Sequence, residues 1–178
     1  MPSIEERHSE DPDRAGEDRA TDSIVDPITG LPDLRFFLLV IDNKISLARR
    51  TLTPLSVGLM QIDDWNRRGL EQRQRALRHV SSILQTTLRS SDTVCTIGHG
   101  RLGVILDDAP ETGAVWAADR VRTVLEDRPS RPVVSLSVGL ACYPSHALDA
   151  DDVLAAAETA LSSASCLGPA RIEVASLV

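Results

Sequence analysis

The sequence lacks the features that mark several large classes of protein. Its three cysteines, among 178 residues, are odd in number and show no C-x-x-C spacing, which argues against a disulfide framework or a cysteine metal site. No run of 18 apolar residues is present, so no segment qualifies as a transmembrane helix. The first 22 residues contain no apolar stretch of the kind found in secretory signals. We therefore expect a cytoplasmic protein with reduced, partly buried thiols and no membrane contact.

Basic surface is also scarce, because the net charge of −7 is unevenly divided along the chain. Residues 1–22 hold eight acidic residues and three arginines, a net charge of −5, which leaves −2 for the rest. High charge and low hydrophobicity predict that this acidic N-terminal tail is disordered. The length of 178 residues predicts a single domain, over residues 23–178. Because this domain is nearly neutral, we expect it to lack the basic face that nucleic acid requires.

The apolar pattern of this domain predicts alternating helices and strands. Helical spacing predicts helices over 33–48, from about 64 to 88, over 109–127 and over 149–165. Apolar and β-branched runs predict strands over 55–62, 93–97, 102–106, 133–142 and 171–175. Helices packed on a mainly antiparallel sheet describe an α+β fold of the ferredoxin or polymerase-palm type. Asp33 and Asp64 are expected to cap helices, and Trp65 and Trp116 to be packing residues.

Five stretches, taken in order, resemble the conserved blocks of one known family. They are DPITGLPDLRFF (26–37), LSVGLMQIDDWN (55–66), RSSDTVCTIGHGRLGVIL (89–106), VSLSVGLACYPSH (134–146) and AAAETALSSASCLGPARI (155–172). Each is weak alone, but together their order and spacing resemble the GGDEF, or diguanylate cyclase, domain. The resemblance implies a GGDEF/nucleotide-cyclase-like fold, a central mainly antiparallel sheet surrounded by helices.

Active members of this family condense two GTP molecules into cyclic di-GMP, using a divalent metal held by carboxylates. Here Gln61 replaces the metal-binding aspartate of the first strand, and Arg101 occupies a metal-binding acidic position. The whole signature turn falls on Gly98, His99, Gly100, Arg101 and Leu102. Exchanging two carboxylates for an amide and a guanidinium removes the attraction for a cation. The resemblance therefore implies a degenerate member with no catalytic residues, no bound Mg²⁺ and no enzyme activity.

A second site of the family keeps its residues. Arg89 and Asp92 form an R-x-x-D five residues before the turn, which resembles the inhibitory site that binds the product, and Arg120 falls where the family adds another arginine. The resemblance implies that the arginine binds guanine and phosphate of cyclic di-GMP while the aspartate accepts from guanine N1 and N2. A planar, bidentate donor beside a carboxylate suits that ligand. The ligand usually stacks as an intercalated dimer, so a homodimer would follow.

Structural roles offer another explanation for these residues. An arginine in the last turn of a helix complements the helix dipole, and an aspartate beside a turn is common. The leading hypothesis is a catalytically inactive effector that binds cyclic di-GMP in bacterial second-messenger signalling. One alternative is a regulatory module that binds a protein partner and has vestigial nucleotide sites, and another is a residual cyclase or GTP sensor. Within the turn, Arg101 and His99 are expected to be solvated.

Overall fold

The computed structural model describes residues 23–130 and 133–176; the predicted acidic tail, residues 1–22, lies outside these described residues. The helices are α2 (Leu34–Thr51), α3 (Leu70–Thr87), α4 (Glu111–Asp127) and α5 (Ala150–Leu167), with a 3-10 turn η1 (Trp65–Arg67). The strands are β1 (Leu55–Ile62), β2 (Thr93–Gly98), β3 (Arg101–Asp107), β4 (Leu136–Tyr143) and β5 (Ile172–Val174). Among the described residues, no helix is long and apolar enough to cross a membrane.

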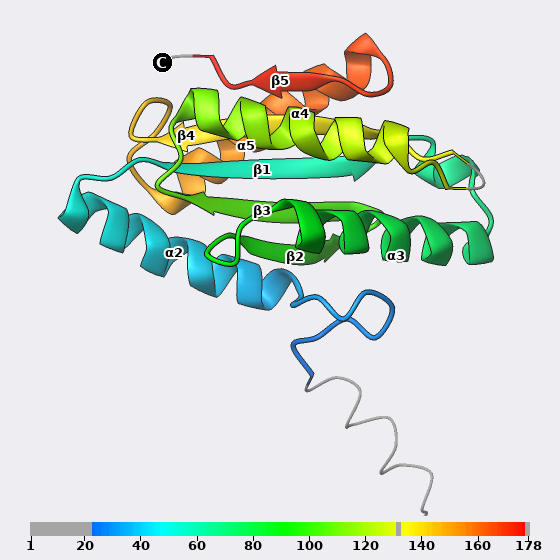
Figure 1. The fold of residues 1–178 in the computed structure, drawn as a ribbon. Coiled ribbons are helices and arrows are strands. Elements are labelled where there is room, and N and C mark those ends of the chain that lie inside the picture. The colour runs from blue at the N-terminus through cyan, green and yellow to red at the C-terminus, as the bar shows by residue number, and fades with distance from the viewer. Residues whose placement is uncertain (1–22, 131–132, 177–178) are drawn as a thin grey trace, which may run out of the picture.

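One five-stranded sheet in the order β2-β3-β1-β4-β5 forms the centre of the fold. All of its pairs are antiparallel except β4 with β5. Helices α3 and α4 lie in front of the sheet in Figure 1 and α5 lies behind it, while α2 runs beside the β2 edge. Side chains of α3 and α4 form one apolar layer against the sheet, and side chains of α2 and α5 form a second. The arrangement confirms the predicted α+β fold, including the order of its helices and strands.

The central strand β1 is buried on both faces, which explains its continuous apolar sequence. Met60 and Ile62 pack in the layer formed with α3 and α4, whereas Val57 and Leu59 pack in the layer of α2 and α5. The cysteines follow this burial: Cys95 and Cys142 are buried free thiols, and Cys166 is an exposed one. Burial raises the pKa of the Cys95 thiol to about 12 and also raises the pKa of Cys142.

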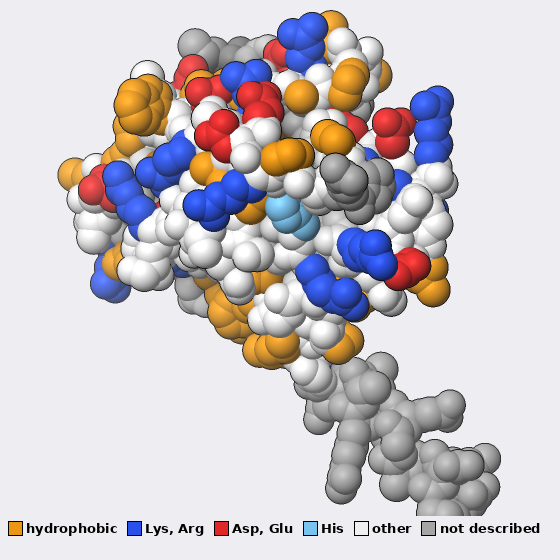
Figure 2. Space-filling model, turned by 45° about the vertical axis from the view of Figure 1, so that its right-hand side comes forward, with side chains coloured by type: hydrophobic (Ala, Val, Ile, Leu, Met, Phe, Trp, Pro, Cys, Tyr) orange, Lys and Arg blue, Asp and Glu red, His pale blue; other side chains and the backbone are white. Residues whose placement is uncertain are grey.

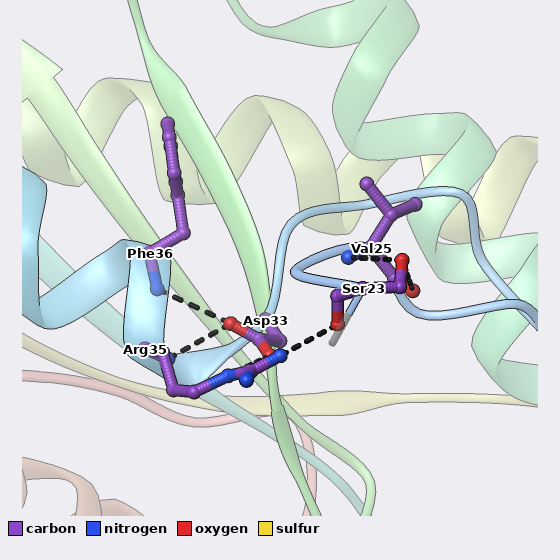
Figure 3. Close-up of polar contacts among 5 residues, drawn as sticks. All are labelled: Ser23, Val25, Asp33, Arg35 and Phe36. Carbon is purple, nitrogen blue, oxygen red and sulfur yellow. Dashed lines mark hydrogen bonds and ion pairs between the residues drawn. The ribbon is translucent and has the colours of Figure 1, made fainter. Parts of the chain in front are cut away.

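Helix α2 begins at the capping residue that the sequence predicts. The Asp33 carboxylate accepts hydrogen bonds from the backbone N–H groups of Arg35 and Phe36, at 2.9 and 3.2 Å (Figure 3). The Arg35 guanidinium bonds the same carboxylate and the carbonyl of Ser23, which fixes the incoming chain to the helix. Partial desolvation raises the pKa of Asp33, but these hydrogen bonds outweigh it, so the pKa lies below its usual value.

Three sequence predictions about local structure are wrong. Asp64 does not cap α3, because it adopts a left-handed backbone (φ 56°) before η1 and the helix begins later, at Leu70. Strand β4 begins at Leu136 rather than at Val133, because β1 ends at Ile62, the residue paired with Leu136. Trp116 is not a packing residue, since 79% of it is exposed. Trp65, by contrast, is partly buried against the core.

Gly139 on β4 allows α5 to approach the sheet, and this contact generates a testable prediction. A Cβ atom there would lie 2.1 Å from the Leu161 nitrogen and 2.3 Å from the Ala157 carbonyl oxygen, both backbone atoms that cannot turn away. Gly139→Ala should therefore lower the free energy of unfolding by about 3 kcal/mol or more in urea titrations. Gly113→Ala in α4, where the nearest atom is 3.5 Å away, should be neutral or stabilising by about 0.5–1 kcal/mol. Equal stability of the two variants would contradict this account.

Candidate functional site

The candidate sites lie at opposite ends of the sheet. In the pairing of β1 with β3, Gln61 lies opposite Arg101 and Leu55 lies opposite Asp107. The seven residues of β3 separate these ends by about 20 Å, at 3.3–3.4 Å per residue. The turn-end cavity, of about 860 Å³, is lined by residues that include Gln61, Asp63, Trp65, His99, Ser165 and Pro169. The RxxD cavity, of about 360 Å³, is lined by residues that include Arg89, Asp92, Asp107, Asp108, Trp116 and Arg120.

The signature turn is a tight hairpin, as predicted. His99 and Gly100 connect β2 to β3 with positive φ angles of 52° and 74°, which is typical of a two-residue hairpin turn. His99 is exposed, as expected, whereas Gly100 is buried beneath the Trp65 indole. A Cβ at Gly100 would lie 2.3 Å from that ring, and the Arg73 guanidinium lies 5.4 Å from its centroid on another side. Side chains of the protein itself therefore cover this part of the turn.

Gln61, at the position for which the resemblance implies a metal-binding aspartate, offers a hydrogen-bond donor. Its Nε2 lies 3.1 Å from the carbonyl oxygen of Ile62 and 3.3 Å from those of His99 and Gly100. Three acceptors around one amide group require its nitrogen, rather than its oxygen, to face them. The carbonyl of Ile62 therefore accepts from Gln61.

Arg101 differs from the expectation of a solvated turn residue. It is the first residue of β3, its side chain is only 28% exposed, and its guanidinium forms an ion pair with Glu158 of α5. The reason is its register opposite Gln61, which directs both side chains to the α2 and α5 face of the sheet. Glu158 thus neutralises the positive charge that the sequence alone assigns to this end.

Asp63, one of the two aspartates that line the turn-end cavity, is engaged in hydrogen bonds within the protein. Asp63 accepts hydrogen bonds from the hydroxyls of Ser135 and Ser137 at 2.6 and 2.7 Å, and from the Ala170 N–H at 3.0 Å. Within residues 23–130 and 133–176, no group of three His, Cys, Asp or Glu side chains could hold a metal ion. The donor set at this end does not fit a divalent cation, and the absence of bound Mg²⁺ stays a prediction.

The arginine-rich segment that follows β1 serves local structure. Arg68 donates to the carbonyls of Asp63 and Val133, and Arg73 donates to those of Trp65 and Asn66. On the face shown in Figure 2, basic side chains are interspersed with acidic ones and with uncoloured surface. That face carries no continuous basic stripe of the kind that binds a nucleic acid backbone.

The three residues predicted to bind cyclic di-GMP meet in one cavity. Arg89 and Asp92 lie in the turn between α3 and β2, and Arg120 of α4 lines the same cavity. Asp92 Oδ2 accepts the Arg89 backbone N–H at 2.9 Å, and the Asp92 N–H donates to the Arg89 carbonyl at 3.0 Å. The Arg120 guanidinium donates to the carbonyl of Thr87, one of the last carbonyls of α3. The predicted residues are therefore brought together with their positions fixed by backbone contacts.

One further residue of this region escaped the sequence analysis, and another was wrongly assigned. Lys44, the single lysine of the chain, forms an ion pair with Asp107 and donates to the Ser91 carbonyl at 3.2 Å. Trp116 lies on the rim, where its role as a packing residue was wrongly predicted. Helical spacing alone could have placed Trp116 beside Arg120, four residues later, whereas the contact between Lys44 and Asp107 joins residues 63 positions apart.

The sheet order, the tight hairpin and the cavities at its two ends define an α+β domain of the nucleotide-cyclase type. The chain belongs to the GGDEF family, because the family model "Diguanylate cyclase, GGDEF domain" matches residues 23–171. Diguanylate cyclase DosC of Escherichia coli K12 is 29% identical over 160 residues, which cover 84% of this chain and 35% of DosC. The chain thus spans about a third of that relative.

Solved structures agree with this assignment. The GGDEF domain of YfiN (TpbB) from Pseudomonas aeruginosa matches with a TM-score of 0.78 and 24% identity, covering 86% of this chain and 95% of that one. The GGDEF domain of DgcB from Caulobacter crescentus, solved in complex with cyclic di-GMP, matches with a TM-score of 0.76 and 17% identity, covering 86% and 96%. At these identities the likeness establishes the fold.

The contacts of Lys44 generate a prediction about the R-x-x-D turn. Lys44→Met removes the link between α2 and the Ser91 carbonyl and leaves Asp107 unpaired beside Asp92 and Asp108. We expect a loss of about 1 kcal/mol in the free energy of unfolding and faster amide hydrogen exchange at residues 89–92. Arg50→Met, at an exposed position of the same helix, is the control and should leave that exchange unchanged. Unchanged exchange in Lys44→Met would exclude a role for the lysine in holding the turn.

Proposed function

We propose that this GGDEF domain is a non-catalytic receptor for cyclic di-GMP that acts in bacterial second-messenger signalling. The observation that supports it most is the convergence of Arg89, Asp92 and Arg120 on one cavity, about 20 Å from the turn. The ligand would occupy this RxxD cavity, and the turn-end cavity would perform no chemistry. The cyclic di-GMP in the DgcB structure shows that a domain of this fold can bind the dinucleotide.

Hydrogen-bonding chemistry supports this ligand at the RxxD cavity. Guanidinium groups bind phosphate and the acceptor edge of guanine as planar, bidentate donors. Asp92 uses Oδ2 to hold the turn, so its Oδ1 can accept from guanine N1 and N2. Lys44 neutralises Asp107, which lowers the repulsion that the cavity's carboxylates exert on an incoming dianion.

The same reasoning explains why catalysis is not part of the proposal. The reaction needs a divalent cation to offset the phosphate charge, and here an amide donor and an ion-paired arginine stand at its ligand positions. Trp65 and Arg73 cover the buried side of the turn. Asp63, which lines the turn-end cavity, already accepts three hydrogen bonds from the protein. Among the residues that the structure describes, no group of three His, Cys, Asp or Glu side chains could hold the metal ion that a triphosphate requires.

The binding prediction is tested by calorimetric titration of cyclic di-GMP into the full chain. We expect binding at micromolar concentration or tighter, and a loss of roughly tenfold to a hundredfold in affinity for Arg89→Ala, since each charge-assisted hydrogen bond is worth about 1.5–3 kcal/mol. Arg122→Ala, an exposed arginine of α4 paired with Asp119, should bind as the unaltered chain does. Light scattering during the titration would reveal ligand-induced dimers. No heat with the unaltered chain would overturn the proposal.

The catalytic prediction concerns the purified chain incubated with GTP and either Mg²⁺ or Mn²⁺. No cyclic di-GMP should form above the level without protein, whereas an active diguanylate cyclase in the same assay gives product. The single reversions Gln61→Asp and Arg101→Glu should also remain inactive, because each restores only one of two missing carboxylates. Arg101→Glu would in addition place a carboxylate beside Glu158, which repels it. Product formation by the unaltered chain would refute the proposed loss of catalysis.

A further inference from the structure

We propose that Trp116 is a stacking platform in the RxxD cavity, on which one guanine base of the bound dinucleotide lies. This inference rests on the proposed function and extends it to a residue that the R-x-x-D pattern does not contain. Trp116 belongs to α4 and is 79% exposed, the second largest exposed fraction among the large apolar residues described. The other tryptophan, Trp65, is packed on the core. Leaving an indole in water forfeits its large apolar burial, and a ligand-binding role is one reason for it to do so.

The position of the indole beside the charged groups supplies that reason. Trp116 and Arg120 are four residues apart on α4 and so lie on the same side of the helix. Both line the cavity that also contains Arg89 and Asp92 on the turn after α3. An aromatic side chain, two arginines and three aspartates therefore line one cavity of about 360 Å³.

Small residues keep the area beside the indole open. Gly113, one helical turn before Trp116, and Ala117, directly after it, both line the cavity. Ala109 and Pro110, at the start of α4, add two more small lining residues. With 79% of its surface exposed, the indole is open to a flat heteroaromatic ring.

These features match the two parts of a guanine nucleotide. Stacking of a base on an aromatic side chain is worth about 1–3 kcal/mol, and it depends on the ring face rather than on the polar edge. The base edge is then available to Asp92, and the phosphates to Arg89 and Arg120. The indole supplies affinity, and the charged groups supply recognition of guanine.

The experiment compares cyclic di-GMP affinity among variants of the full chain. Trp116→Ala should weaken binding by roughly tenfold to a hundredfold, and Trp116→Phe by less, because the smaller ring still stacks. Leu39→Ala removes a comparably exposed apolar side chain from α2, outside the cavity, and should bind as the unaltered chain does. Urea titrations should give all three the stability of the unaltered chain.

Fluorescence separates stacking from an indirect effect on the fold. With only two tryptophans present, Trp65→Phe leaves Trp116 as the sole indole, and stacking of guanine on it should quench its emission. If Trp65→Phe does not fold, the quenching of the unaltered chain minus that of Trp116→Phe reports the same event. Quenching that saturates at the calorimetric midpoint supports the platform.

The outcomes distinguish a failure of the stacking platform from a failure of the proposed receptor function. If the unaltered chain binds and Trp116→Ala binds equally tightly, the stacking platform is wrong and the receptor function stands. If Trp116→Ala changes self-association without changing ligand affinity, the indole is a contact between protein copies and the inference is also wrong. If the unaltered chain binds no cyclic di-GMP, both proposals fall.

Discussion

The pairing of β1 with β3 is the constraint on which both candidate sites depend. The two-residue turn at His99 and Gly100 places Gly98 of β2 opposite Arg101 of β3. The pairing of β3 with β1 then places Gln61 opposite Arg101 on its other side. A slip of one residue would move every β3 side chain to the other face of the sheet. Arg101 would then leave Glu158, and the buried side chains of β3 would leave their apolar layers. The burial of β1 on both faces makes such a slip costly.

At the turn end, each residue that differs from the family's signature contacts another group of the protein. Gln61 bonds nearby carbonyls, Arg101 pairs with Glu158, and Trp65 covers Gly100. These contacts bury polar groups only with partners present, which avoids the cost of unsatisfied donors. Restoring a carboxylate at one position would break an existing contact without completing a metal site. The proposed loss of catalysis would therefore rest on several contacts rather than on one.

Local patterns predicted most of the fold, and long-range contacts account for what they missed. The eight residues of β1 and the Asp33 cap follow from neighbouring residues alone. The beginning of β4 depends on where β1 ends, and the environment of Arg101 depends on Glu158, 57 residues away. The contact of Arg89 with Asp92 at one turn was predictable, since the two are three residues apart. The exposure of Trp116 was not, because an indole usually indicates core packing.

The RxxD cavity is held from three helices, which has a consequence for how binding could be transmitted. Arg89 follows α3, Arg120 extends from α4, and Lys44 of α2 bonds the carbonyl of Ser91 within the turn. A ligand that engages both arginines fixes α3 relative to α4, and the same turn is linked to α2. Helix α2 directly follows the Asp33 cap, which holds the Ser23 carbonyl through Arg35. Under the proposed function, ordering of the turn by the ligand would therefore reach the beginning of the domain through these contacts.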